Sequence, residues 1–296
     1  MILRPTGNNY FCIFLKKKRL TQIVTLTIIM TQDSHTDYLN EKRQEFTKVM
    51  GKKTSKKDKE FLKTYDPGSY DRPSVAVDVL VFTVDLKKGL EVFLIKRNNP
   101  PFEGCWALPG GFAGIDESLE KAAARRLKEE TGIKKLHMEQ LYTFGEPGRD
   151  PRTRVISVAY IALAPKDKVG YSPGDAQDAS WFGVSLMEGR VVFDSDIHLA
   201  FDHESMVKLA IERLRGKINY TDIALNLLDD KQRFTIYELQ KIHEAILGKE
   251  LNAANFRRSF IMNYVNKGLA EETGELCKEF SSRASKYFRY LKNTAG

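Results

Sequence analysis

Hydrophobic patterning beyond about residue 65 predicts first a strand-rich region and then a helix-rich one. Several runs of β-branched and apolar residues are typical of buried strands, and Gly89 between the first two indicates a hairpin. Residues 118–131 instead repeat apolar side chains at three- and four-residue intervals, which predicts one amphipathic helix. Strands on both sides of a single strong helix indicate an α+β fold with a mixed sheet. The predicted strands are residues 74–85, 91–96, 154–164 and 179–184.

The helix-rich region has the order of elements found in a winged helix-turn-helix. An amphipathic helix over residues 203–216 and a short helix over residues 222–228 come first. Thr235 and Glu238 have the spacing of a capping box, so a helix is expected to begin there, and Asn252 is expected to cap the next helix. Two strands then form the wing. The later elements are predicted at residues 236–246 and 253–266 for the helices, and at 269–272 and 286–291 for the strands.

These patterns divide the chain into three parts. Residues 1–65 are a lysine-rich N-terminal extension, which we expect to be poorly ordered or to include residues ahead of a true start at Met30. The apolar stretch before Met30 is short and no small-residue cleavage site follows it, which disfavours a secretion signal. Residues 66–216 are predicted to form the α+β domain, and residues 217–296 the winged helix-turn-helix domain.

Composition narrows the class of protein further. The 296 residues are 42% hydrophobic and 29% charged, which predicts a folded core and excludes wholesale disorder. No run approaches the ~18 apolar residues that a membrane-spanning helix needs, which excludes an integral membrane protein. Three cysteines without CxxC spacing disfavour a disulfide framework or a structural zinc site, so we expect a cytoplasmic protein. The net charge of +8 suits an anionic partner without identifying it.

The most informative residues follow Leu108-Pro109-Gly110, where residues 111–133 run GFAGIDESLEKAAARRLKEETGI. This segment resembles the Nudix box, in which a glycine and a glutamate precede Arg-Glu-aliphatic-any-Glu-Glu-any-Gly-aliphatic. The resemblance to the Nudix superfamily implies an α/β/α sandwich with a mixed sheet. It also implies that helix glutamates hold Mg²⁺ against a substrate diphosphate, a role that suits hard oxygen ligands. The matching residues are Gly111, Glu117, Arg125, Leu127, Glu129, Glu130, Gly132 and Ile133.

One position departs from this pattern, because Arg126 stands where the family has its first glutamate. Positions 126, 129 and 130 share one helical face, and a positive charge ~4 Å from a cation costs about 4 kcal/mol per unit charge at an effective dielectric of 20. We therefore expect Mg²⁺ binding at Glu129 and Glu130 to be weak or lost. The resemblance makes these two glutamates and Arg125 the residual catalytic residues. Arg126 is expected to pair with Glu129 or Glu130, to contact a diphosphate in place of the metal, or to point to solvent while a relocated carboxylate completes the metal site.

Cationic residues around the box are expected to line a ligand site. The stretch Gly148-Arg149-Asp150-Pro151-Arg152 resembles one in Nudix proteins related to binders of ADP-ribose and sugar nucleotides; the alternative is an ordinary loop. Arg97 and the segment 102–106 lead into the box and are expected to flank the same cleft, with Trp106 favoured as a core residue. The expected ligand-binding residues are Arg97, Gly110, Gly111, Arg126, Arg149 and Arg152.

The second helix of the helix-turn-helix is predicted to read DNA. Arginine and asparagine are suited to guanine and adenine edges in the major groove, whereas wing lysines suit phosphates. The alternative is a small helical domain that contacts proteins. The expected DNA-binding residues are Asn255, Arg257, Arg258, Lys267, Arg283 and Lys286, with Arg289 also on the wing.

The combination of the two domains resembles the NrtR-type Nudix-related transcriptional regulators over about residues 65–292. The helix that begins FTIYELQ at Phe234 and the later Asn255-Phe256-Arg257-Arg258 carry this resemblance. It implies a homodimer on a palindromic operator in double-stranded DNA, with ADP-ribose or a sugar as the effector. The first hypothesis is therefore a ligand-responsive DNA-binding regulator. The alternatives are a Mg²⁺-dependent Nudix hydrolase acting on ADP-ribose or another nucleoside diphosphate derivative, and a regulator that retains some hydrolysis.

Overall fold

The computed structural model describes residues 55–133, 136, 138–169, 176–277 and 285–291. The chain separates into two compact units, residues 1–65 with 294–296, and residues 66–293. In the first unit, helix α2 (Lys56–Thr64) begins with a capping box between Ser55 and Asp58. The remainder of the predicted N-terminal extension, residues 1–54, lies outside the described residues.

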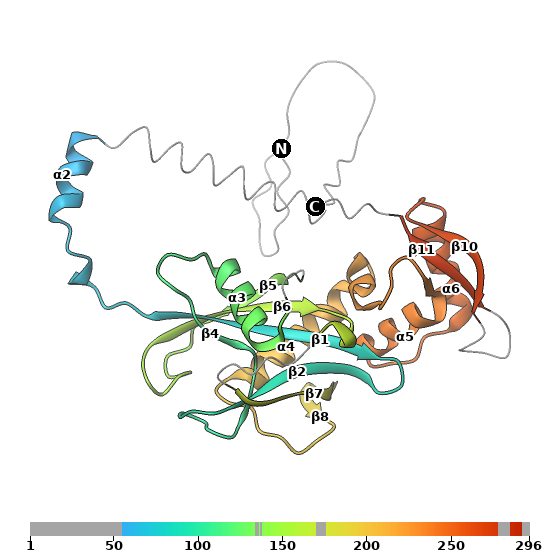
Figure 1. The fold of residues 1–296 in the computed structure, drawn as a ribbon, viewed down its shortest axis with the longest axis horizontal. Helices are drawn as coiled ribbons and strands as arrows, with labels where there is room; N and C mark the ends of the chain where they lie inside the picture. Colours follow the sequence, from blue (N-terminus) through green and yellow to red (C-terminus); the bar gives the residue numbers. More distant parts are fainter. Residues whose placement is uncertain (1–54, 134–135, 137, 170–175, 278–284, 292–296) are drawn as a thin grey trace, which may run out of the picture. The chain divides into compact units, whose positions relative to one another are not determined.

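A mixed sheet organises the first part of the second unit (Figure 1). Its strand order is β5-β6-β1-β2-β7-β8, with β3 beside β2 and β4 beside β1. β1 pairs with β6 in parallel, and the remaining pairs are antiparallel. The strands are β1 (Ser74–Asp85), β2 (Gly89–Arg97), β3 (Trp106–Ala107), β4 (Gly110–Phe112), β5 (Met138–Phe144), β6 (Val155–Leu163), β7 (Ala176–Met187) and β8 (Arg190–Phe193), with short 3-10 helices η1 (Pro67–Ser69) and η2 (Lys166–Lys168).

Helices α3 (Leu119–Thr131) and α4 (His203–Lys217) cover opposite faces of this sheet. Successive side chains of β1 point to opposite faces of the sheet, so that the strand contributes to an apolar core on each face. Val77, Val79 and Val81 pack with α3, whereas Leu80 and Phe82 point to the other face and pack with α4. The predicted α/β/α sandwich with a mixed sheet is confirmed.

On one side of β1, its two halves pair with different strands. Residues 76–78 pair with β4, and residues 82–85 pair with β2. Gly110 lies so close to β1 that a β-carbon there would come within 2.4 Å of an Asp78 carboxylate oxygen and 2.5 Å of the Val77 carbonyl oxygen. Only glycine fits this approach, which places β4 directly beside the first half of β1.

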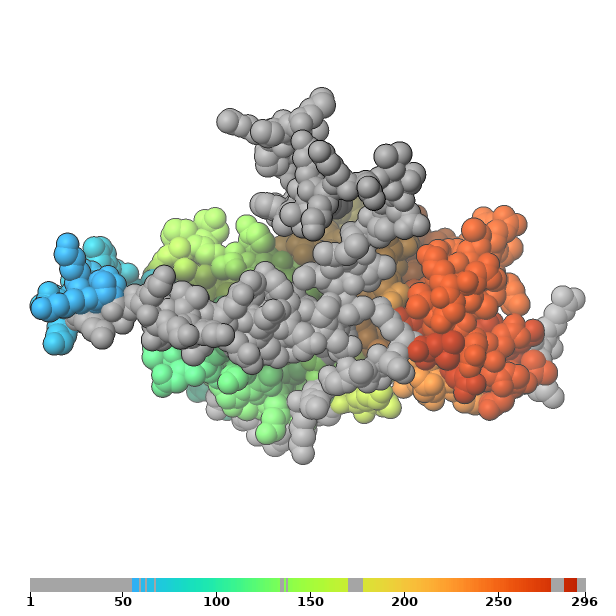
Figure 2. Space-filling view, turned by 90° about the horizontal axis from the view of Figure 1, so that it is seen from above, coloured from blue at the N-terminus to red at the C-terminus, as the bar shows by residue number. Residues whose placement is uncertain are grey.

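The winged helix follows α4 and closes around a three-stranded sheet in the order β10-β11-β9. Helix α5 begins with the predicted capping box, since Thr235 accepts from the Glu238 amide and Glu238 accepts from the Thr235 amide. Figure 2 shows this domain as one lobe, coloured orange to red. Its elements are the 3-10 helix η3 (Asp222–Leu227), β9 (Phe234–Thr235), α5 (Ile236–Leu247), α6 (Ala253–Phe260), η4 (Ile261–Val265), β10 (Ala270–Cys277) and β11 (Ser285–Tyr290).

The second helix differs from the continuous α-helix predicted over residues 253–266. Helix α6 gives way at Ile261 to the π-helical turn η4, in which the Asn266 amide bonds to the Ile261 carbonyl at 2.8 Å. The ring of Tyr264 in this turn stacks on the ring of buried Phe260, with centroids 5.3 Å apart. The predicted helix therefore covers the right residues but changes from α- to π-helical hydrogen bonding at Ile261.

The apolar core on the α4 face of the sheet continues into the winged helix without a break. One cluster includes Leu80 of the sheet, Met206 and Leu214 of α4, and Leu239 and Phe288 of the winged helix. Helix α5 contacts both α4 and β2. In the described part of the chain, no helix is long and apolar enough to span a membrane.

Candidate ligand-binding and nucleic-acid-binding sites

The loop between β4 and α3 is held by an arginine clamp. Glu117 accepts from the Gly114 amide at 2.7 Å and from Arg125 Nε at 3.1 Å, with a second close contact to Arg125 Nη2. These hydrogen bonds, led by the one from Arg125, lower the pKa of Glu117 to about 2. Arg125 also reaches the Phe112 carbonyl and Glu129, at 3.3 Å each. Its contacts therefore fix the loop to the helix.

The adjacent Arg126 turns toward β4. Its Nη1 lies 3.3 Å from Glu129 Oε2, and its guanidinium covers Gly111, where a β-carbon would come within 2.6 Å of Cζ. The side chain is 23% exposed, and its buried Nε has no hydrogen-bond partner among the described residues. The predicted pairing with Glu129 is confirmed. The alternative that Arg126 simply points to solvent is wrong, because Gly111 leaves room for the guanidinium against the backbone.

This arrangement does not fit a divalent metal ion. The carboxylate of Glu129 already has an arginine on either side, Arg125 and Arg126, each at 3.3 Å. Glu130, the other predicted metal ligand, is buried with 4% of its surface exposed. The described residues contain no group of three or more His, Cys, Asp or Glu side chains that could hold a metal. A relocated carboxylate that would complete the Mg²⁺ site is therefore not found in this part of the chain.

A buried ionic network lies behind the loop that contains Arg149. Nε and Nη2 of Arg149 donate to the two carboxylate oxygens of Asp202 at 2.9 and 2.6 Å, and Nη2 lies 3.9 Å from Asp78. Asp78 in turn accepts a short hydrogen bond from Ser157. The Arg149 side chain is only 5% exposed. Its position favours a role in fixing the loop to the start of α4 over direct contact with a ligand.

His203 joins this network at the first turn of α4. Its Nδ1 accepts from the Leu108 amide at 3.0 Å, so in the neutral ring the proton is on Nε2, which lies 3.6 Å from Asp78. Burial lowers the pKa of His203, although the charge of Asp78 opposes this shift. His203 therefore ties the segment between β3 and β4, which leads into the box, to helix α4.

Two arginines and two phenylalanines form a row beside the box. The guanidinium of Arg97 lies 4.9 Å from the centre of the Phe201 ring, and that of Arg152 lies 5.8 Å from the same ring and 5.4 Å from the ring of Phe112. Phe102, on the predicted flanking segment, makes an edge contact with Phe201 at 4.8 Å. The guanidinium groups of half-buried Arg97 and exposed Arg152, next to aromatic faces, suit a ligand that carries both phosphate and a flat ring.

The two arginines differ in how their charge is compensated. Arg152 donates two hydrogen bonds to buried Asp150, which lowers the pKa of that carboxyl and raises that of Arg152. Arg97 donates instead to the carbonyls of Pro101 and Asn99, at 2.9 and 3.2 Å. Burial and the neighbouring charge of Arg152 lower the pKa of Arg97. An anion placed between the two arginines would relieve this repulsion.

Sequence reasoning predicted the arginines of this site but missed Phe112, Phe201 and Asp202. Asp202 stands directly before the first turn of α4, a position at which aspartate commonly interacts with a helix start. No local pattern indicates Phe201, because its backbone has a φ of +55° that is set by the surrounding structure.

Helix α6 presents a separate cationic surface. Asn252 caps the helix by accepting from the Asn255 amide at 3.0 Å, and Phe256 packs against His243 with ring centroids 5.0 Å apart. This orientation leaves three of the predicted DNA-binding residues exposed. In the described part of the chain, neither arginine among them has an ion-pair partner. The three residues are Asn255, Arg257 and Arg258.

The wing offers less uncompensated charge than expected. Lys286 is paired with Glu272 at 2.7 Å, and Arg289 is paired with Glu271 at 2.5 Å. Lys267 is exposed and donates to Asn263 at 3.3 Å. Arg283 lies outside the described residues. Within the described residues, α6 therefore offers two arginines without an ion-pair partner, whereas Lys286 and Arg289 of the wing are both paired.

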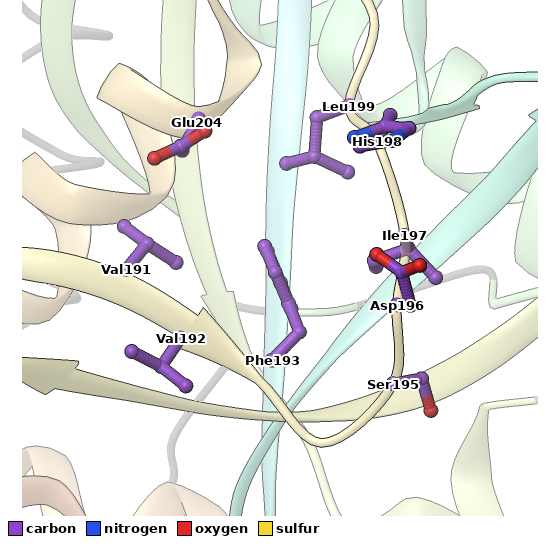
Figure 3. Close-up of a pocket in the computed structure, with 9 residues that line it drawn as sticks. All are labelled: Val191, Val192, Phe193, Ser195, Asp196, Ile197, His198, Leu199 and Glu204. Atoms are coloured by element: carbon purple, nitrogen blue, oxygen red, sulfur yellow. The ribbon is translucent and has the colours of Figure 1, made fainter.

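A cavity of about 350 Å³ lies between β8, the segment after it and the start of α4 (Figure 3). Apolar side chains such as Phe193 and Leu199 make up one part of its lining, and Asp196, His198 and Glu204 make up the polar part. None of the residues predicted to bind a ligand or DNA lines it. The cavity is therefore separate from both sites described above.

Comparison with protein families identifies two domains in this chain. Residues 72–199 match the family described as NUDIX domain, and residues 224–290 match the NrtR DNA-binding winged helix domain. These matches contain the box around α3 and the whole of the helix-turn-helix with its wing. The resemblances predicted from the two motifs are confirmed.

Individual relatives are similar over both domains. The chain is 34% identical over 232 residues to an ADPR responsive transcriptional repressor, NtrR, of Acinetobacter baylyi, covering 78% of this chain and 87% of the relative. It is 38% identical over 164 residues to an ADP-ribose pyrophosphatase of Methanocaldococcus jannaschii, covering 54% of this chain and 86% of that protein. The crystal structure of Shewanella oneidensis NrtR complexed with a 27mer DNA matches with a TM-score of 0.60 and 33% identity, covering 73% of this chain and 93% of that one.

Proposed function

Because this chain belongs to the NrtR-type Nudix-related transcriptional regulators, we propose that it is a repressor that binds an operator through its winged helix and responds to ADP-ribose bound in its Nudix domain. The observation that carries the ligand assignment is the row of Arg97, Phe201 and Arg152 beside the box. ADP-ribose has a diphosphate for the guanidinium groups and an adenine for the aromatic face. The A. baylyi relative, named as responsive to ADPR, supports the same ligand.

The DNA assignment rests on the exposed face of α6. Asn255, Arg257 and Arg258 are free to contact base edges, while buried Phe260 fixes the orientation of the helix. We propose a homodimer on a palindromic operator, because one such helix covers only one half-site. We also propose a cytoplasmic location, with which a DNA partner is consistent.

Binding to the DNA upstream of its own gene cluster, measured by fluorescence anisotropy at a fixed salt concentration, tests this proposal. We expect binding that is specific relative to a scrambled sequence and that ADP-ribose weakens. Specific binding that ADP-ribose leaves unchanged would favour a sugar effector. If the operator and scrambled DNA bind equally, the regulator assignment is wrong.

The second candidate is a Mg²⁺-dependent hydrolase of ADP-ribose, favoured by the retained Glu129 and Glu130 and by the similarity to an ADP-ribose pyrophosphatase. The ion pair between Arg126 and Glu129 argues against it. Release of AMP and ribose 5-phosphate from ADP-ribose with Mg²⁺ would distinguish the two. We expect none from the native chain, and activity equal to that of an Arg126→Glu variant would contradict the argument from the replaced carboxylate.

A further inference from the structure

We propose that Arg126 takes the place of the metal ion in this Nudix domain, so that the diphosphate of the ligand binds to its guanidinium without a divalent cation. The inference rests on the proposed function, since it concerns how the same site holds ADP-ribose. Arg126 would then account both for the loss of metal binding and for the retained binding of an anionic ligand.

The position of the guanidinium is the first argument. Arg126 extends from the face of α3 that carries Glu129 and lies on Gly111 of β4, where a β-carbon would come within 2.6 Å of Cζ. It therefore stands between the helix and the glycine loop that leads into it. Its Nη1 is the atom nearest Glu129, at 3.3 Å. Within the described residues, Nη2 makes no hydrogen bond, so this donor remains for a ligand.

The local charge is the second argument. The clamp of Arg125 with Glu117 is internally neutral, and so is the pair of Arg126 with Glu129. A glutamate at position 126 would change one positive charge into one negative charge, a difference of two units, which equals the charge of one Mg²⁺. With that glutamate, a diphosphate could approach only if a cation screened the carboxylates. With Arg126 the surface is neutral and offers a guanidinium donor.

The chemistry of the side chain is the third argument. A guanidinium is planar and permanently charged, and it matches the spacing of phosphate oxygens with two parallel donors. It also costs no dehydration of a bound metal. Arg152 lies over the ring of Phe112, the residue that follows Gly111 in β4, and would supply further positive charge to a ligand that extends from the box.

The test is calorimetric titration of the full chain with ADP-ribose, first in EDTA and then with Mg²⁺ added. We expect the affinity of the native chain to be the same in both. Arg126→Gln, which removes the charge but keeps much of the volume, should bind ~10- to 100-fold more weakly in EDTA, as expected for the loss of a charged hydrogen bond. Arg126→Glu should bind weakly in EDTA and recover with Mg²⁺. Thermal melting of each variant shows that it is folded.

Arg190→Gln is the matched control, because Arg190 is an exposed arginine on β8, outside the site. It should bind as the native chain does. A native chain that binds ADP-ribose only with Mg²⁺ would overturn the inference and leave the proposed function standing. So would an Arg126→Gln variant that binds as tightly as the native chain in EDTA. A native chain that binds ADP-ribose under neither condition would instead overturn the proposed function.

Discussion

Arg125 and Arg126 are neighbours in the sequence, but their guanidinium groups make different contacts and have different roles. Arg125 is neutralised by Glu117, and the hydrogen bonds between them fix the loop before α3. Arg126 shares Glu129 with Arg125 and faces Gly111. A change of Arg125 is therefore expected to disturb the fold of the loop, whereas a change of Arg126 alters the chemistry of the site.

Arg97 is expected to contribute directly to ligand affinity. Its side chain donates only to backbone carbonyls, so its charge has no carboxylate partner among the described residues. The Arg97→Gln variant should bind ADP-ribose ~10-fold or more weakly, measured by the same titration, because a charged hydrogen bond is lost. An unchanged affinity would place the ligand away from Phe201.

Asp202 is expected to contribute chiefly to stability. It accepts both donors of Arg149, a side chain that is 5% exposed. The Asp202→Asn variant leaves that buried charge with only the more distant Asp78. We expect a loss of about 3 kcal/mol in the free energy of unfolding, measured with urea. Asp196→Asn, a change of an exposed aspartate elsewhere, should cost much less, and equal losses would contradict this account.

How far the sequence predicts the site differs from residue to residue. The spacing of the box places Arg126 within reach of Glu129 and Glu130, because residues three and four apart on a helix are neighbours, but the structure is needed to choose Glu129. The cover of Gly111 by Arg126 depends on how β4 lies against α3, which no local pattern specifies. The contacts of Arg97 and Arg152 with Phe201 likewise join residues from three distant parts of the chain.

Among the elements, the strongly patterned ones are predicted and the edge elements are missed. β1 begins and ends where the apolar run does, and α3 lies within the predicted helix of residues 118–131. β5 was not predicted, because it is a sheet-edge strand in which Leu141 is the one buried residue, so its sequence lacks a long apolar run. β8, a strand of four residues at the other edge of the sheet, was not predicted for the same reason. β5 and β8 form because they pair with the neighbouring strands β6 and β7, and not because of their own sequence pattern.

The contact between α5 and α6 is expected to be sensitive to acid. Burial lowers the pKa of His243, which packs on Phe256, to about 4. In the unfolded chain the pKa is near 6.5, so the unfolded state binds more protons below that pH and stability falls as pH decreases toward 4. From pH 7.5 to 5 this group should cost about 2 kcal/mol.

Urea unfolding of the native chain and of His243→Leu at both pH values measures the effect. The variant cannot titrate at this position, so its stability should fall by about 2 kcal/mol less over the same pH change. His203, which is also buried with a lowered pKa, contributes equally to both proteins and cancels in the comparison. Equal pH dependence in the two would show that His243 is not responsible.

Helix α6 is expected to read bases with its arginines. Arg257→Ala or Arg258→Ala should weaken operator binding by about 1–3 kcal/mol and relax preference at one base pair if the side chain contacts that base. Anisotropy with single-base variants of the operator measures both effects. Lys286→Ala should cost less, since Glu272 already compensates that charge. Uniform weakening on every sequence would indicate phosphate contacts alone.

The continuous core has a consequence for how a ligand signal reaches DNA. Residues 66–293 form one compact unit, and α4 lies within the cluster that extends from the sheet into the winged helix. The first turn of α4 carries His203, next to the Asp202 that holds the loop with Arg149. Its fifteen residues extend about 22 Å to the winged helix. A rigid helix is thus shared by the ligand region and the DNA-binding domain.

Arg215, near the end of α4, connects the two domains by hydrogen bonds. Its Nε donates to the Ile246 carbonyl at the end of α5 at 3.0 Å, and its Nη2 donates to the Leu186 carbonyl of β7 at 3.5 Å. The guanidinium therefore satisfies a carbonyl in the last turn of the helix that supports α6, while also contacting the Nudix sheet. Movement of α4 relative to either partner would strain these bonds.

We expect Arg215→Met to retain operator binding but to reduce the effect of ADP-ribose on it, because the polar connection between α4 and α5 is lost while the apolar contact remains. Coupling between two sites is typically worth about 1–3 kcal/mol, so the shift in operator affinity caused by ADP-ribose should shrink by several-fold. Anisotropy with and without ADP-ribose measures that shift.

Arg213→Met is the matched control, since Arg213 lies on the same helix and donates at 3.4 Å to the Leu141 carbonyl of β5, within the Nudix domain. If both variants reduce the response equally, general loosening of α4 accounts for the loss, and the specific role of Arg215 is wrong.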